Sequence, residues 1–257
     1  MLTIVGNGPS RKQIDLDSLE RWWGCNAIYR DATPELLFAV DIRMHIEILH
    51  EGYYKNNKLA VGNFDYIERG HLPMLKFGHQ DFEIHEFFQD DDDFMVIQGA
   101  KAEDFVFEDA KNVVTFLGVN SKYMSNIIRY DYSILKNLLA GQAALGYALL
   151  NGEREIALLG FDALQYDMCE NVYQGSNFYR DKYTSEDGVM TAQKAQFIAL
   201  LEHFKDSKVY FQKSIDEYEE IDYTTLSYYE NVMKDKWILG QGYESDPLAD
   251  KMTNTIV

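Results

Sequence analysis

The first ten residues, Met1-Leu-Thr-Ile-Val-Gly-Asn-Gly-Pro-Ser10, constrain the fold of this chain more than any other stretch. Leu2 to Val5 is a short apolar run rich in β-branched residues, which predicts a buried strand. Gly6-Asn7-Gly8 ends this strand, because glycine permits positive φ and a close approach to the backbone. Ser10 is placed to cap a helix over residues 12–20. A strand, a glycine-rich turn and a helix N-terminus together predict an anion-binding site, and an unliganded turn is the alternative.

Composition narrows the class of protein and of partner. The chain has 257 residues, 46% of them hydrophobic, which suits one large α/β domain or a domain with a lid. A net charge of −18 argues against nucleic acid and anionic membranes as partners. No apolar run approaches the roughly 20 residues of a membrane helix, and Met1 leads directly into the first strand, without a signal peptide. Cys25 and Cys169 form neither a disulfide framework nor a zinc signature, so we expect a cytoplasmic protein with reduced thiols.

Small polar residues recur where predicted strands end. Asn7, Asn26 and Asp41 each follow one of the first three predicted strands, and Asp162 follows the strand over residues 155–159, directly behind Gly160-Phe161. The carboxyl ends of parallel strands meet at one edge of a sheet, where ligands of open α/β folds bind. The pattern therefore predicts a shared polar rim that binds a ligand, with ordinary helix capping as the alternative.

The second half of the chain adds a helix and a candidate lid. A helix is predicted over residues 133–151, and Gly141 lies on its thin side, which suits close packing or a nearby ligand. The polar, tyrosine-rich stretch 163–188 is long for a simple connection and predicts a lid. We expect residues 1–215, including this lid, to form a Rossmann-like domain, and residues 216–257 to form a helical segment and tail.

An acidic run raises the question of a metal site. Asp90 to Asp93 are four consecutive acids, which could hold a divalent cation against a diphosphate or could form a solvated turn. The neighbouring sequence favours the turn, because no hydrophobic strand fixes two of the acids in place. The histidines are scattered without metal-ligand spacing, so no metal-binding residues are expected.

Two blocks of sequence resemble the bacterial lipooligosaccharide sialyltransferases of glycosyltransferase family 42. The first is Val5-Gly-Asn-Gly-Pro-Ser10 followed by Gly24-Cys-Asn26 and Tyr29. The second is Ala140-Gly141 and Ala144-Leu-Gly-Tyr147, followed by Leu159-Gly-Phe-Asp162. The resemblance implies a Rossmann-like domain that binds a cytidine monophosphate (CMP) sugar, a closing lid, and metal-independent transfer with inversion. It assigns donor contacts to Asn7 and Asn26, and places Asp41 near the leaving group.

The chain also departs from the family pattern. Leu139-Ala140 replaces a Thr-Ser pair, and Ala163-Leu164 replaces an aromatic pair that includes the tyrosine on the leaving phosphate. We expect Tyr173 or Tyr166 to substitute for that tyrosine. The family's general base is a lid histidine, but this sequence has no histidine between His85 and His203. An acid of the lid, with Asp181 as our choice over Glu186 and Asp187, could serve as base if burial raises its pKa.

Together these observations predict an α/β protein with a Rossmann-like, mostly parallel sheet, helices on both faces and a lid. The predicted function is transfer of a sialic-acid-like sugar from a CMP-sugar, as donor substrate rather than cofactor, to a glycan or other hydroxyl acceptor. A non-catalytic nucleotide-binding protein and a metal-dependent transferase using a nucleotide diphosphate sugar are the alternatives. The predicted nucleotide-binding residues are Gly6, Asn7, Gly8, Ser10, Asn26, Asp41, Gly141, Gly160 and Asp162, and the catalytic ones are Tyr173, Tyr166 and Asp181. The sequence leaves open a homo-oligomeric state.

Overall fold

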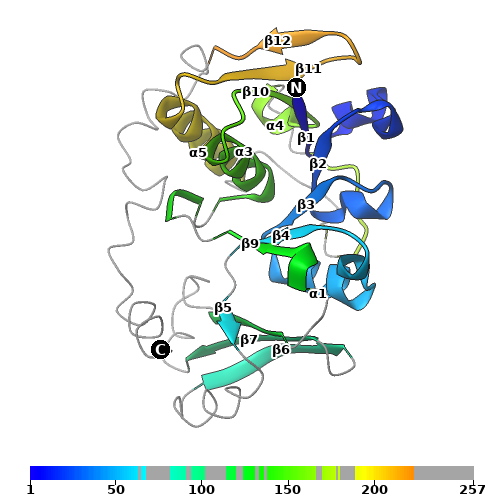
Figure 1. Cartoon of the computed structure of the whole chain (residues 1–257), viewed down its shortest axis with the longest axis vertical. Coiled ribbons are helices and arrows are strands. Elements are labelled where there is room, and N and C mark those ends of the chain that lie inside the picture. Colours follow the sequence, from blue (N-terminus) through cyan, green and yellow to red (C-terminus); the bar gives the residue numbers. More distant parts are fainter. Residues whose placement is uncertain are drawn as a thin grey trace. The chain divides into compact units, whose positions relative to one another are not determined.

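A computed structural model describes most of the chain and divides it into two compact units (Figure 1). Unit 1 consists of Met1–Arg21 with Asp131–Val257, and unit 2 is Trp22–Tyr130. The described residues are 1–62, 65–67, 82–90, 94–101, 114–119, 124–130, 133–135, 138–165, 170–177, 179 and 189–222.

The strands of unit 1 follow the order β12-β11-β10-β1. β1 pairs with β10 and β10 with β11 in parallel, whereas β12 adds an antiparallel edge. All residues of β1 and the last four of β10 are buried, as expected for strands of a parallel sheet that is covered on its faces. The bounds are β1 Leu2–Val5, β10 Glu155–Leu159, β11 Lys208–Gln212 and β12 Tyr218–Glu220. β12 replaces the first part of the helical segment predicted after residue 215.

The helices of unit 1 are α3 (Ala140–Leu150), α4 (Asp162–Gln165) and α5 (Val189–His203). α3 packs against β1 and against α5, which runs beside it in Figure 1. α5 in turn contacts β11 through the stacked rings of Phe197 and Phe211, whose centroids are 6.4 Å apart. Both aromatic side chains are buried, so they join helix and sheet into one core.

Two helix predictions in unit 1 require correction. The predicted helix over 12–20 is replaced by two short 3-10 helices, Pro9–Gln13 and Leu16–Ser18, because Ile14 is extended and the Asp15 carboxylate caps the second of them at Asp17 N. The predicted helix from Ser133 begins instead at Ala140. Gln196 of α5 accepts a hydrogen bond from Leu139 N at 3.1 Å and so provides the polar contact at the start of α3.

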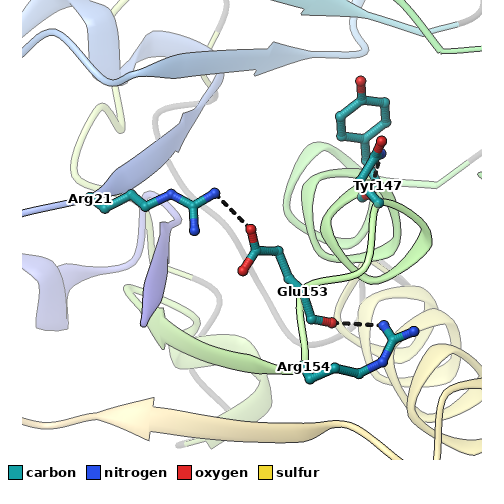
Figure 2. A network of polar contacts seen from close by, with 5 residues as sticks. Arg21, Tyr147, Glu153 and Arg154 are labelled. Atoms are coloured by element: carbon teal, nitrogen blue, oxygen red, sulfur yellow. Dashed lines mark hydrogen bonds and ion pairs between the residues drawn. The ribbon is translucent and has the colours of Figure 1, made fainter.

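The C-terminal end of α3 is fixed by a set of polar contacts (Figure 2). Gly152 has φ +94°, and the chain reverses there as in a glycine-terminated helix. Arg154 Nη1 donates to the carbonyls of Leu149 at 3.0 Å and Glu153 at 2.9 Å. The Glu153 carboxylate also pairs with Arg21 at 2.6 Å. This ion pair is solvent-exposed, so we expect it to contribute less than about 1 kcal/mol to the free energy of unfolding. The hydrogen bonds to backbone carbonyls therefore contribute more to fixing this end of the helix.

Unit 2 contains four parallel strands and a second, mainly antiparallel sheet. The parallel strands follow the order β2-β3-β4-β9, and the second sheet follows β5-β8-β7-β6. The parallel strands are β2 Trp22–Cys25, β3 Leu36–Ala39, β4 Leu59–Val61 and β9 Ile127–Arg129. The strands of the second sheet are β5 Asp65–Ile67, β6 Phe82–Asp90, β7 Phe94–Lys101 and β8 Val114–Val119. Helix α1 of unit 2 is Ile42–His50. The prediction of an α/β fold with a mostly parallel sheet is therefore confirmed.

Helix α1 is tied to unit 2 by a bidentate ion pair and by a buried histidine. The Arg30 guanidinium donates to both oxygens of Glu47, at 2.7 and 2.6 Å, and Tyr29 donates to the same carboxylate at 2.6 Å. His45 is 1% exposed, and its Nε2 lies 2.6 Å from the carbonyl oxygen of Ala39 at the end of β3. Burial lowers the pKa of His45 to about 4, so the neutral ring donates to Ala39 at physiological pH.

We expect the stability of the protein to fall as the pH is lowered from about 6.5 to about 4. In this window the unfolded chain protonates His45 and the folded chain does not, so the free energy of unfolding decreases by up to about 1.4 kcal/mol per pH unit. Urea unfolding at a series of pH values measures this slope. His45→Gln should flatten it, whereas His50→Gln, an exposed control on the same helix, should not. An unchanged slope in His45→Gln would show that another group is responsible.

Candidate functional site

The candidate site of unit 1 forms where β1 and β10 end side by side. These strands pair in parallel from Leu2 opposite Ile156 to Val5 opposite Leu159, so their carboxyl ends lie at the same edge. The pairing continues beyond the strands. Gly6 N donates to Leu159 O at 2.8 Å, and Gly8 N donates to Gly160 O at 2.9 Å. The two predicted loops are therefore joined into one structure by their own backbone hydrogen bonds.

The glycines of these loops are needed because the two backbones approach so closely. A Cβ on Gly6 would lie 2.6 Å from Gly160 O, and one on Gly8 would lie 1.9 Å from Asp162 Oδ2. Gly160 has φ +74°, a conformation that favours glycine, and a Cβ there would lie 2.8 Å from Gly6 O. Contacts within the protein thus account for the glycine requirement at positions 6, 8 and 160.

Asp162 supplies a carboxylate where the sequence predicts an external anion. Its side chain is 3% exposed and accepts from Ser10 N at 3.1 and 3.3 Å, through its two oxygens, and from Ser10 Oγ at 2.8 Å. Ser10 therefore does not cap a following helix through its side chain. Gly8 occupies the N-cap position of the 3-10 helix, and Ser10 locks the turn to the start of α4.

Residues 170–177, which we call the Tyr173 segment, lie against the glycine turn. Val172 N donates to Asn7 O at 2.8 Å. The Arg11 guanidinium donates from Nη2 to the Tyr173 hydroxyl at 2.8 Å, and the Arg11 Cζ atom lies 5.1 Å from the centroid of the Tyr173 ring. Tyr173 is 8% exposed, whereas the residues from Gln174 to Asn177 are exposed. Tyr173 is thus the buried anchor of the described part of the predicted lid.

Arg11 is the residue of this cluster that sequence reasoning missed. It is 5% exposed, although it belongs to a short 3-10 helix directly after the glycine turn. The feature of the sequence that could have identified Arg11 is a cation directly after a predicted anion-binding turn, in a chain of net charge −18. A hydrophobicity pattern does not reveal such a residue, because arginine is usually exposed.

The remaining predicted residues have different surroundings. The Cα of Gly141 in α3 faces Phe161, since a Cβ there would lie 2.8 Å from the ring, so this thin side of the helix is filled by protein. Asn26 and Asp41 belong to unit 2. Asn26 follows β2 with φ +51°, and its Oδ1 is buried without a hydrogen-bond partner in the described part of the chain. Asp41 is exposed, and its carbonyl accepts from His45 N at 2.9 Å. Tyr166 and Asp181 lie outside the described residues.

The geometry gives little support to a metal site or to a cysteine nucleophile. Within the described ranges, no three His, Cys, Asp or Glu residues are grouped to hold a metal ion. Asp90 ends β6, and the rest of the acidic run lies outside those ranges. Cys25 is buried, and burial raises the pKa of its thiol to about 12, so it stays protonated at neutral pH and is not poised as a nucleophile.

No helix in the described part of the chain has the length and apolarity required to cross a membrane.

We expect Gly8→Ala to destabilise the protein strongly. The added methyl would meet both the buried Asp162 carboxylate and Gly160 O, so the two loops must separate, at a cost of about 3 kcal/mol. Gly152→Ala is the matched control, because that position has φ +94° but no atom within 4 Å of the added Cβ, and the conformational strain alone costs about 1 kcal/mol. Urea denaturation measures both. A loss in Gly8→Ala no larger than in the control would contradict the close approach.

Comparison of the chain with protein-family models, with curated proteins and with solved structures gave no match.

Proposed function

We propose that this protein is a glycosyltransferase-like protein that binds a CMP-activated sugar at the carboxyl edge of β1 and β10. The main support is the joined pair of loops: Gly6 to Ser10 and Gly160 to Asp162 form a preorganised structure at the sheet edge where α/β folds bind nucleotides. The Tyr173 segment lies directly on this structure. The similarity to glycosyltransferase family 42 falls on the same residues and supplies the ligand class.

In this proposal, binding and transfer are assigned to different residues. The family resemblance assigns nucleotide contacts to Asn7 of unit 1 and, independently, to Asn26 of unit 2, and assigns the phosphate contact to Tyr173 or Tyr166. The acceptor hydroxyl attacks the anomeric carbon, the bond from that carbon to the phosphate oxygen breaks, and CMP leaves with the electron pair. Asp181 accepts the proton of the acceptor hydroxyl. A nucleotide-activated donor also fits a cytoplasmic location.

A nucleotide-binding protein without transferase activity is the second candidate. The observation in its favour is that the sequence has no histidine between His85 and His203, where the family has its general base. The carboxylate of Asp162 is also bonded to Ser10, which makes it a structural residue rather than an obvious substitute base. Both candidates share the binding site and differ only in chemistry.

We expect calorimetric titration to show binding of CMP in preference to UDP and GDP, with and without Mn²⁺. Asn7→Ala and Asn26→Gly should each weaken CMP binding by about 0.5–1.5 kcal/mol, the contribution of one hydrogen bond. Glycine is chosen at position 26 because it accepts the positive φ of Asn26, and Ala at position 7 leaves the backbone bond to Val172 intact. Asn57→Ala, whose amide bonds to Tyr53 O, is a control for amide removal elsewhere. Absence of CMP binding in the parent would contradict the proposal.

Transfer itself is tested with a CMP-sialic acid and a panel of glycan acceptors. We expect release of CMP that persists in the presence of a chelator. Asp181→Asn should reduce this release with little change in CMP affinity, because a base acts on the acceptor and not on the nucleotide. Binding of CMP without either transfer or hydrolysis of the donor would favour the non-catalytic candidate.

A further inference from the structure

The hairpin of β11 and β12, drawn in orange tones in Figure 1, carries an exposed apolar tip. Ile215 in its turn is 43% exposed, and Tyr218 at the start of β12 is 39% exposed. Met1 and Leu150 are the other large apolar side chains that are exposed in the described part of the chain. Single exposed apolar residues are common on protein surfaces, but these two lie on one hairpin and touch through a hydrogen bond. Residues 215–218, which we call the hairpin tip, therefore offer an apolar contact surface.

The hairpin tip lies at the same edge of the sheet as the glycine turn. β11 pairs in parallel with β10, and β10 pairs in parallel with β1. Phe211 is opposite Leu158, so β10 and β11 both end one residue later, and the hairpin turn leaves the sheet beside residues 160–162. Adjacent strands are about 4.8 Å apart, so the end of β11 is about 10 Å from the end of β1. A ligand on the glycine turn and a ligand on the hairpin tip would therefore be neighbours.

The ring of Tyr218 is held in place by bonds to its hydroxyl. The hydroxyl donates to Ile215 O at 2.9 Å and accepts from Gln212 Nε2 at 3.3 Å. Gln212 is 3% exposed and also accepts from Thr3 Oγ1 of β1 at 3.3 Å. Because the hydroxyl is engaged within the hairpin, we expect a ligand to contact the carbon atoms of the ring. A ring that is already fixed loses little side-chain entropy when a ligand packs on it.

Carboxylates surround this ring. Burial, followed by the charges of Asp216 and Glu20, raises the pKa of Tyr218, and both acids are exposed. The hairpin carries further exposed acids at Glu217 and Glu220. Such a surface repels anionic ligands and a second copy of this chain, whose net charge is −18. Carboxylate oxygens accept hydrogen bonds, so they suit a neutral ligand that is rich in hydroxyl donors.

We propose that the hairpin tip is the acceptor subsite of this protein and that its ligand is a neutral sugar unit packed on the Tyr218 ring. The assignment rests on the proposed transferase function, because it names the acceptor side of that reaction. The C–H groups on one face of a pyranose pack on an aromatic ring, and its hydroxyls donate to carboxylates such as Asp216. Transfer requires the acceptor hydroxyl beside the donor, and the hairpin tip holds the acceptor two strands away from β1.

The test measures binding of three neutral disaccharides, lactose, cellobiose and chitobiose, by NMR titration of the parent and its variants. We expect at least one of them to bind the parent. Tyr218→Ala should lower its affinity about fivefold to tenfold, as expected for loss of an aromatic contact. Tyr218→Phe keeps the ring and should stay within about threefold of the parent. Leu150→Ala is the matched control, because it removes an exposed apolar side chain where α3 ends ahead of β10, at the opposite edge, and should leave the affinity unchanged.

A second variant keeps the test valid if Tyr218→Ala disturbs the hairpin. Ile215→Ala removes apolar surface from the tip but keeps the carbonyl that accepts from Tyr218, and it should lower the affinity about threefold.

Asp216→Asn tests the contacts to sugar hydroxyls separately. It should lower the affinity several-fold, because a charge-assisted hydrogen bond is lost. Asp206→Asn is its control, since it removes the same charge from an exposed acid that precedes β11, at the opposite edge. Glucuronic acid should displace the bound disaccharide less than glucose does, because the acidic hairpin repels its carboxylate. Stronger displacement by glucuronic acid would contradict a neutral ligand.

The outcomes separate the acceptor subsite from the proposed nucleotide site. CMP affinity should be equal in the parent and in Tyr218→Ala. Binding of CMP without any of the disaccharides, or disaccharide affinities that Tyr218→Ala and Ile215→Ala leave unchanged, would overturn the subsite and leave the proposed function intact. A disaccharide bound through Tyr218 in a protein that binds no CMP would overturn the proposed function and retain the tip as a sugar site. A dimer in solution that Tyr218→Ala dissociates would show that a second copy covers the tip, and would overturn the proposal.

Discussion

The parallel pairing of β1 with β10 is the constraint on which the candidate site depends. It brings together Ser10 and Asp162, which are 152 residues apart in the sequence, and aligns their loops so that three backbone amides of the turn find partners on the β10 side. The glycines permit this approach, and the Asp162 carboxylate completes it. The protein thus places its own anion, the buried Asp162 carboxylate, at the turn.

Much of the fold is predictable from local patterns, and the failures have local causes. Continuous apolar runs correctly indicate β1, β3 and β10, because strands of a covered parallel sheet are buried on both faces. β6 is missed, since its register shifts between Ile84 and Glu86 and such a bulge interrupts the alternation that identifies a strand. The helix expected over 12–20 fails because the Asp15 side chain competes for the backbone at Asp17, a preference that a periodicity search does not count.

The candidate site is predictable only in part, because its key contacts join distant stretches of sequence. The sequence indicates that glycine is needed at positions 6 and 8, but not that the approaching atoms are Gly160 O and Asp162 Oδ2. Arg11 and Tyr173 are separated by 162 residues, and neither the burial of the guanidinium nor its hydroxyl partner leaves a local signature. The roles of Asn26 and Asp41 toward a ligand stay predictions.

The division of unit 1 into two stretches of chain has a consequence for synthesis on the ribosome. Residues 1–21 are made before unit 2, and β10 follows β1 only roughly 150 residues later, after all of unit 2. At about 10 residues per second, β1 waits roughly 15 seconds for the strand that covers its edge. The four parallel strands of unit 2 are complete before β10 is made, so they can pair while β1 still exposes Leu2, Ile4 and Val5. Strand β1 is therefore a segment of the nascent chain that needs protection from wrong pairing.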